Sequence, residues 1–213
     1  MNKAIIITLC FIFLQSYTTK PITVELKGGK DVPCTLYMED GSTKKGLVAF
    51  PLKSGANSIT LKSNGTKEKV DLENVKKVIF EATTVNFAME YYNLPVYNFN
   101  GKKIQNHKQM LKLYIAGKKV SLYTGTFDWS GYANAGNGFQ GFSYSGLSYY
   151  CMKPEEPAAT LIHEDFGEIN KNADFKLYAS RYFADYPELV QKIKDKVYTY
   201  KNIDQVVEDY NNH

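Results

Sequence analysis

The chain has 213 residues, of which 44% are hydrophobic and 14% aromatic, and its formal net charge is +4. This composition can bury one good core or two small ones, so it excludes intrinsic disorder. The chain has a single arginine, Arg181. Because proteins that read nucleic acid usually place arginine forks on phosphates and guanine, the composition also argues against a nucleic-acid partner.

Charge is distributed unevenly along the chain. Residues 21–122 contain 16 lysines against 9 acidic residues, whereas residues 154–213 contain 7 basic against 12 acidic residues. Either the acidic tail packs beside the basic body within one molecule, or the basic part forms a face for anionic envelope material. We favour the intramolecular explanation.

Residues 1–19 have the layout of a secretory signal peptide, with one lysine, an apolar run and a polar stretch. The run is shorter than the roughly 20 apolar residues of a membrane-spanning helix. Cys10 lies inside it, behind a leucine, which disfavours lipid anchoring. We therefore expect cleavage near Thr18 or Thr19, a periplasmic or extracellular location, and no transmembrane segment in the mature chain.

Residues 20–84 are expected to form an N-terminal β module, because short β-branched and aromatic runs alternate with turn signals. The expected strands are 23–26, 33–38, 47–50, 58–61, 69–72 and 77–81. Between two of them, Asn64-Gly65 predicts a type I′ hairpin, in which both turn residues need positive φ.

Residues 85–166 are expected to form a second β region, with strands at 84–97, 111–127, 147–152 and 158–163. The second of these is divided by a turn at 116–118. Residues 128–146 contain five glycines interleaved with aromatic residues. This pattern indicates a functional or mobile loop rather than a regular strand or helix.

Residues 167–213 change to a helical period and predict three short helices. Asp185 is the expected cap of the second and Asn202 of the third. The apolar faces are Phe175, Tyr178, Ala179, Tyr182 and Phe183; Leu189, Val190, Ile193 and Val197; and Ile203, Val206, Val207 and Tyr210. The expected fold class is α+β: an antiparallel β-rich body, of small barrel or sandwich modules, with a C-terminal cap of three short helices.

Two segments of this tail carry a resemblance: residues 181–189 (RYFADYPEL) and 204–211 (DQVVEDYN). They resemble the closing segment of uncharacterised exported proteins of Bacteroidota-type bacteria, which also place strands first and helices last. The resemblance covers about the last forty residues. It implies a cell-envelope or secreted location and assigns no site residues.

Short motifs predict no catalytic residue, cofactor or metal site. Residues 136–141 match the dinucleotide pattern G-x-G-x-x-G, but no helix follows to hold a pyrophosphate. Residues 141–145 stop short of a nucleophile elbow. The three histidines, His107, His163 and His213, lack metal-ligand spacing. His163, Glu164 and Asp165 should not converge on a metal, because adjacent residues of a strand point to opposite faces, and this group is expected in an exposed loop.

Two cysteines, Cys34 and Cys151, remain if the signal peptide is removed. In an oxidising compartment they could form a disulfide that closes a long loop. The alternative is that both are free thiols in apolar cores.

Three functions remain open at this point. The leading one is a non-catalytic envelope protein with an interaction or structural role, whose partner is an unknown envelope protein or polysaccharide. The second is a carbohydrate-binding module that uses the aromatic residues Trp129, Tyr132, Phe139, Phe142 and Tyr144. The third is an enzyme, which would be favoured by a cleft joining Asp128 or Glu164 to a neighbour with a perturbed pKa.

Overall fold

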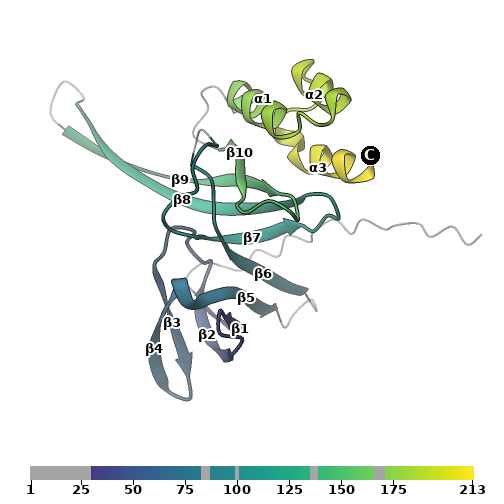
Figure 1. The fold of residues 1–213 in the computed structure, drawn as a ribbon. Helices are drawn as coiled ribbons and strands as arrows, with labels where there is room; N and C mark the ends of the chain where they lie inside the picture. Colours follow the sequence, from purple (N-terminus) through teal and green to yellow (C-terminus); the bar gives the residue numbers. More distant parts are fainter. Residues whose placement is uncertain (1–29, 83–86, 99–100, 135–138, 166–170) are drawn as a thin grey trace, which may run out of the picture.

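The computed structural model describes residues 30–82, 87–98, 101–134, 139–165 and 171–213. They form one antiparallel sheet of ten strands with helices at the C-terminal end (Figure 1). The strands are β1 (Lys30–Met38), β2 (Thr43–Phe50), β3 (Ser58–Ser63), β4 (Thr66–Asp71), β5 (Val75–Ala82), β6 (Phe87–Leu94), β7 (Gln109–Ile115), β8 (Ser121–Asn134), β9 (Phe139–Met152) and β10 (Thr160–Glu164). The helices are α1 (Lys171–Tyr182), α2 (Pro187–Lys194) and α3 (Ile203–Asn212), with short 3-10 turns η1 (Leu72–Asn74) and η2 (Tyr200–Asn202).

The strand order is β10-β9-β8-β7-β6-β5-β1-β2-β3-β4. Strands that are consecutive in the chain are neighbours in the sheet, with the exception of β4 and β5. After β4, η1 returns the chain to β1, and β5 pairs with the edge of β1 that β2 does not occupy. Asp71 makes this turn possible, because its carboxylate accepts a hydrogen bond from the Glu73 amide at 3.0 Å. The fold class is therefore α+β and rich in antiparallel strands. The described strands form one open sheet with β4 and β10 at its edges, so the expected small barrel or sandwich modules are not confirmed.

The turn expected at Asn64-Gly65 is confirmed. Both residues have positive φ, at 50° and 76°, and they join β3 to β4. Six consecutive residue pairs follow from this turn, from Ser63 opposite Thr66 to Ser58 opposite Asp71. Local turn chemistry was therefore sufficient to set this register.

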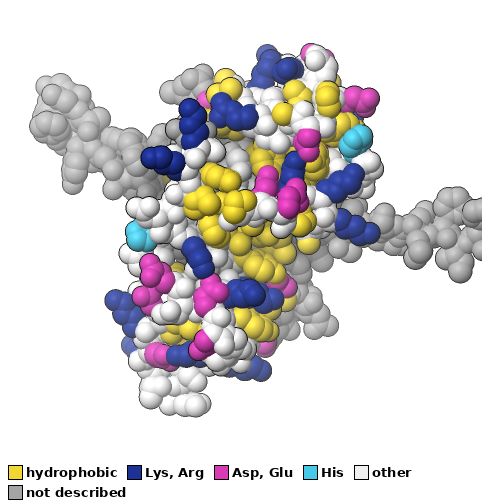
Figure 2. Space-filling model, viewed as in Figure 1, with side chains coloured by type: hydrophobic (Ala, Val, Ile, Leu, Met, Phe, Trp, Pro, Cys, Tyr) yellow, Lys and Arg dark blue, Asp and Glu magenta, His cyan; other side chains and the backbone are white. Residues whose placement is uncertain are grey.

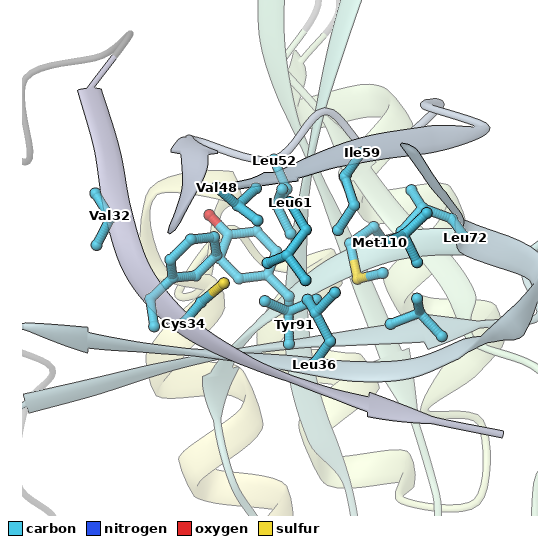
Figure 3. Close-up of a cluster of buried hydrophobic side chains, with 14 of the residues drawn as sticks. Val32, Cys34, Leu36, Val48, Leu52, Ile59, Leu61, Leu72, Tyr91 and Met110 are labelled. Carbon is cyan, nitrogen blue, oxygen red and sulfur yellow. The ribbon is translucent and has the colours of Figure 1, made fainter. Parts of the chain in front are cut away.

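The first core cluster lies between strands of the N-terminal half. Cys34 and Leu36 of β1 lie beside Val48, Leu61 and Tyr91 (Figure 3). Its members come from β1 through β7, so they include residues on both sides of the boundary expected near residue 84. The strands on both sides of that boundary also belong to one sheet, since β5 pairs with β6 over six residues, from Lys77–Tyr92 to Ala82–Phe87.

The second core cluster joins the helices to one face of the sheet (Figure 1). Leu122, Cys151 and Ile162 supply the sheet side. The helical side is supplied by Phe175, Ala179, Phe183, Tyr186, Leu189, Ile193, Ile203, Val206, Val207 and Tyr210. Burying these apolar stripes is what stabilises helices of only 8 to 12 residues.

Two details of the helical prediction are wrong. Val197 is 63% exposed, because α2 ends at Lys194 and Lys196 then adopts a φ of 63° that turns the chain away. The N-cap of α2 is Tyr186 rather than Asp185. The Asp185 carboxylate instead pairs with Lys153 at 2.7 Å and accepts a hydrogen bond from Tyr210, so it ties the helices to the turn after β9.

The expectation of a loop at residues 128–146 is also wrong where the structure describes them. Residues 121–134 and 139–152 pair as two 14-residue strands without a bulge. Beyond Thr124 on β8 the ladder with β7 has ended, so the outer pair projects from the sheet as a two-stranded ribbon (Figure 1). Aromatic residues favour strands, and several stand opposite a glycine here, which compensates for the low strand propensity of glycine.

Charged side chains of both signs are interspersed on the molecular face in Figure 2, around a central group of hydrophobic side chains. Several ion pairs join segments that are distant in sequence, such as Lys108 with Glu39 at 2.6 Å and Lys153 with Asp185. None of the helices in the described part of the chain is long and apolar enough to cross a membrane.

Candidate functional site

A pocket of about 370 Å³ lies at the base of the ribbon. Its sheet side is formed by Gly125 and Phe127 of β8 and by Ser148 and Tyr150 of β9. Because side chains alternate along a strand, these positions lie on the face opposite the one that packs under the helices. The volume is within the usual range of about 300–1,000 Å³ for ligand pockets.

The connection between β2 and β3 closes one side of this pocket. There, Ser54 is 5% exposed and lies beside β8, just past the end of the ladder with β7. Its hydroxyl accepts a hydrogen bond from the Thr126 amide at 2.8 Å, and its carbonyl accepts one from the Met110 amide at 3.2 Å. Ser54 therefore fixes the wall of the pocket to the sheet.

Gly125 allows the β2–β3 connection to pack closely against β8. A Cβ atom on Gly125 would lie 2.9 Å from the Ser54 hydroxyl and 3.0 Å from the Leu111 side chain. We expect Gly125→Ala to lower the free energy of unfolding by about 1–3 kcal/mol, because a buried neighbour must move. Denaturant unfolding measures the change.

The matched control for this substitution is Gly55→Ala. Gly55 lines the same pocket, but a Cβ atom there would meet nothing within 4 Å. Equal losses in both variants would show that the close approach at Gly125 is unimportant.

Hydrogen bonds hold the polar groups of the pocket in place. The Ser148 hydroxyl donates to the Glu164 carboxylate at 3.1 Å, and the Tyr150 hydroxyl donates to the Gln109 side-chain oxygen at 3.2 Å. Burial raises the pKa of Tyr150 to about 12, with a smaller contribution from Glu164. Tyr150 is therefore a neutral donor at physiological pH.

The pocket does join Glu164 to a residue with a perturbed pKa, as the enzyme hypothesis required. Burial moves the pKa of Tyr150 away from physiological pH, whereas a general acid or base works best with a pKa near the operating pH, so Tyr150 is not poised for that role. Within the described residues, the serine hydroxyls of this site bond a carboxylate or a backbone amide rather than an imidazole.

His163 does not lie in an exposed loop, so that expectation is wrong. It is fully buried on β10, where its ring stacks on Tyr200 at 5.1 Å and meets the edge of Phe175 at 6.1 Å. The expectation that neighbouring residues of this segment face opposite ways is confirmed, since Glu164 lines the pocket while His163 packs under the helices. The sequence placed His163 in a loop because its helical neighbours are distant in the chain.

The ladder divides the five aromatic residues of the carbohydrate hypothesis between two faces of the ribbon. Directly paired residues share a face, and Trp129 stands opposite Tyr144 while Phe142 stands opposite Gly131. Positions 129, 142 and 144 therefore continue the face that carries the pocket. The remaining two, Tyr132 opposite Gly141 and Phe139 opposite Asn134, belong to the other face.

Other sequence motifs have the following outcomes. Residues 139–141 of the G-x-G-x-x-G match lie within β9, where the dinucleotide fingerprint would need a helix, and residues 135–138 lie outside the described residues. The signal peptide expected at 1–19 also lies outside them. In the described part of the chain, no three His, Cys, Asp or Glu residues form a group that could hold a metal ion.

The two cysteines are free thiols in the structure. Cys34 belongs to the first core cluster and Cys151 to the second, so the disulfide considered from the sequence is not formed here. Burial raises the pKa of Cys34 to about 11 and that of Cys151 well above its ordinary value. Both thiols therefore act as small apolar core residues.

Comparison with known proteins does not add to this description: no protein-family model, no curated protein and no solved structure matches the chain. The functional argument consequently depends on the pocket and the ribbon. The sequence did not identify Ser54, Gln109, Ser148 or Tyr150 as site residues, because their proximity arises from pairing between distant strands.

Proposed function

We propose that this chain is an exported, non-catalytic protein of the cell envelope that binds a carbohydrate in the pocket at the base of the ribbon. The observation that carries the proposal is the common face of the pocket and of positions 129, 142 and 144. A sugar held in the pocket would be followed along the ribbon by three aromatic positions. Export is inferred from residues 1–19.

The chemistry of the pocket suits a neutral, hydroxyl-rich ligand. Ser148, Tyr150 and Gln109 offer neutral donors and acceptors, and the charged lining residues are one acid, Glu164, and one base, Lys53. Sugar hydroxyls both donate and accept, and a carboxylate forms the stronger, charge-assisted hydrogen bonds with them. The Phe127 and Tyr150 rings add apolar surface on which the carbon-bound hydrogens of a sugar can pack.

The experiment is a binding screen of the chain from Pro21 onward against polysaccharides and peptidoglycan. We expect saturable binding to at least one of them, weakened about tenfold or more by Glu164→Gln. Glutamine keeps an oxygen that can accept from Ser148, so the fold should be retained while the charge is lost. Glu155→Gln, at an exposed residue after β9, is the matched control and should bind as the wild type does.

A pair of ribbon variants tests the part played by the aromatic positions. Trp129→Ala should weaken binding, whereas Tyr132→Ala, at a position on the opposite face, should not. Equal effects of the two substitutions would contradict a one-faced site.

A second candidate, docking to another envelope protein, is favoured by the strand edges of the ribbon. Past Thr124 of β8, and on β9 before Leu147, the ribbon strands pair only with each other among the described strands. Such edges can accept a strand from a partner. If no glycan binds, this candidate replaces the first.

A further inference from the structure

A second groove lies between β2 and β3, next to the sugar pocket, because Lys53 and Ala56 of the β2–β3 connection line both. These strands share one ladder pair, Leu47 with Lys62, whereas β2 pairs with β1 along its whole length. Gly46 allows the close crossing, because a Cβ atom there would lie 2.6 Å from the Lys62 carbonyl oxygen. Beyond this crossing the strands diverge and leave a groove of about 570 Å³.

The floor of the groove is apolar and its rim is charged. The apolar lining residues are Ala49, Pro51 and Ala56, which are exposed or half-buried, and Val48, Leu52 and Ile59, which are buried in the first core cluster. At the rim lie three lysines, Lys53, Lys62 and Lys67, and one acid, Asp31. The rim therefore has three lysines against one acid, Asp31, which pairs with Lys62 at 2.5 Å.

The register of β3 and β4 places further lysines beside the groove. Lys62 and Lys67 are directly opposed, an arrangement that destabilises an antiparallel pair. The same register places Lys69 on the face of the sheet that carries Lys62 and Lys67. Lys45 is on that face as well, because it lies two residues before Leu47, which pairs with Lys62. We call the lysines at 45, 62, 67 and 69 the basic face.

Few carboxylates compensate the basic face. Asp71 lies on the same face of the sheet, but the Asp71 carboxylate caps η1. Among the described residues, no ion pair joins Lys45, Lys67 or Lys69 to a carboxylate. The two opposed lysines repel each other and so lower the stability of the sheet. A bound anion with an apolar part would offset this repulsion and also fill the apolar groove beside it.

We propose that the groove and the basic face bind an anionic lipid, with its apolar part on the floor and its phosphate between the lysines. The apolar floor selects a lipid over a soluble polyanion, because burying hydrocarbon there adds affinity that a polyanion cannot gain. Positive side chains beside the groove attract the negative surface of a membrane. This site shares Lys53 and Ala56 with the lining of the sugar pocket, but the basic face is not part of that lining, so the proposal does not depend on the sugar ligand.

The test is co-flotation of the chain from Pro21 onward with vesicles of phosphatidylglycerol mixed into phosphatidylcholine. We expect binding to these vesicles and none to phosphatidylcholine alone, with a loss of at least tenfold for the double substitution Lys67→Glu and Lys69→Glu. The control, Lys76→Glu with Lys118→Glu, makes the same change in net charge at exposed positions outside the basic face and should bind normally.

Two further measurements separate the lipid from a general polyanion. Ala49→Asp places a charge at an exposed position in the groove and should abolish vesicle binding without lowering the melting temperature. Inorganic polyphosphate should bind more weakly than the vesicles. The proposal is overturned if the vesicles do not bind, if both double variants lose binding equally, or if Ala49→Asp binds normally. Glu164→Gln should still bind vesicles, so a failure of the sugar proposal can be distinguished from a failure of the lipid proposal.

Discussion

Replacing Phe183 by alanine should lower the free energy of unfolding by about 3–5 kcal/mol, the usual cost of removing a buried phenylalanine. Phe183 follows α1 and is fully buried in the second core cluster. Its ring lies 4.9 Å from Tyr182 and 5.0 Å from Tyr210, so it joins α1 to α3. Denaturant unfolding gives the free energy, and hydrogen exchange shows whether the helices detach first.

The control is Leu177→Ala on the same helix. Leu177 is 52% exposed, so its truncation should change the free energy of unfolding by less than about 0.5 kcal/mol. Comparable losses in the two variants would mean that the helices do not pack on the sheet through Phe183.

Replacing Asn211 by alanine is expected to lower the free energy of unfolding by about 1–3 kcal/mol, since it removes three part-buried hydrogen bonds and one exposed hydrogen bond to backbone groups. From α3, the Asn211 side-chain oxygen accepts from the Lys119 amide at 2.9 Å and from the Val120 amide at 3.1 Å. Its side-chain nitrogen donates to the carbonyls of Val120 and Val207, each at 2.9 Å. Asn211 therefore fastens the last helix to the connection between β7 and β8.

Asn212→Ala serves as the comparison, because Asn212 is the exposed neighbour in the same helix. The Val120 amide should exchange with solvent faster in the Asn211 variant only. Unchanged exchange at Val120, together with wild-type stability, would show that this connection is not held by α3.

Local patterns predicted those elements whose shape is decided by nearby residues. The apolar period of residues 203–210 placed Ile203, Val206 and Val207 correctly in the core. Asn64-Gly65 set a hairpin because positive φ at two consecutive positions is a local requirement. Where only a helical face or a two-residue turn decides the outcome, the sequence was sufficient.

The features that local patterns missed depend on partners that are distant in the chain. The local pattern of the glycine-aromatic segment predicts a loop. The segment instead forms parts of two long strands, because its two halves pair with each other through backbone hydrogen bonds. Cys34 and Cys151 could have formed a bond on chain-entropy grounds, but the sheet places them in different clusters. His163 was misplaced for the same reason.

The candidate site was predicted in part. The sequence named the aromatic residues around Trp129, and the register added which of their positions share a face with the pocket. The pocket itself needs Ser54 beside Thr126, two residues that meet where the ladder between β7 and β8 ends. No spacing in the sequence reports such a contact.

Trp129, the only tryptophan of the chain, allows the most direct test of the proposed function. Its fluorescence is measured while the chain from Pro21 onward is titrated with the glycan that the screen retains. We expect a saturable change in emission that needs about tenfold more glycan, or more, in Glu164→Gln and is unchanged in Tyr132→Ala. Normal binding by Glu164→Gln, or binding that leaves the emission of Trp129 unchanged, would contradict a site that extends from the pocket along the ribbon.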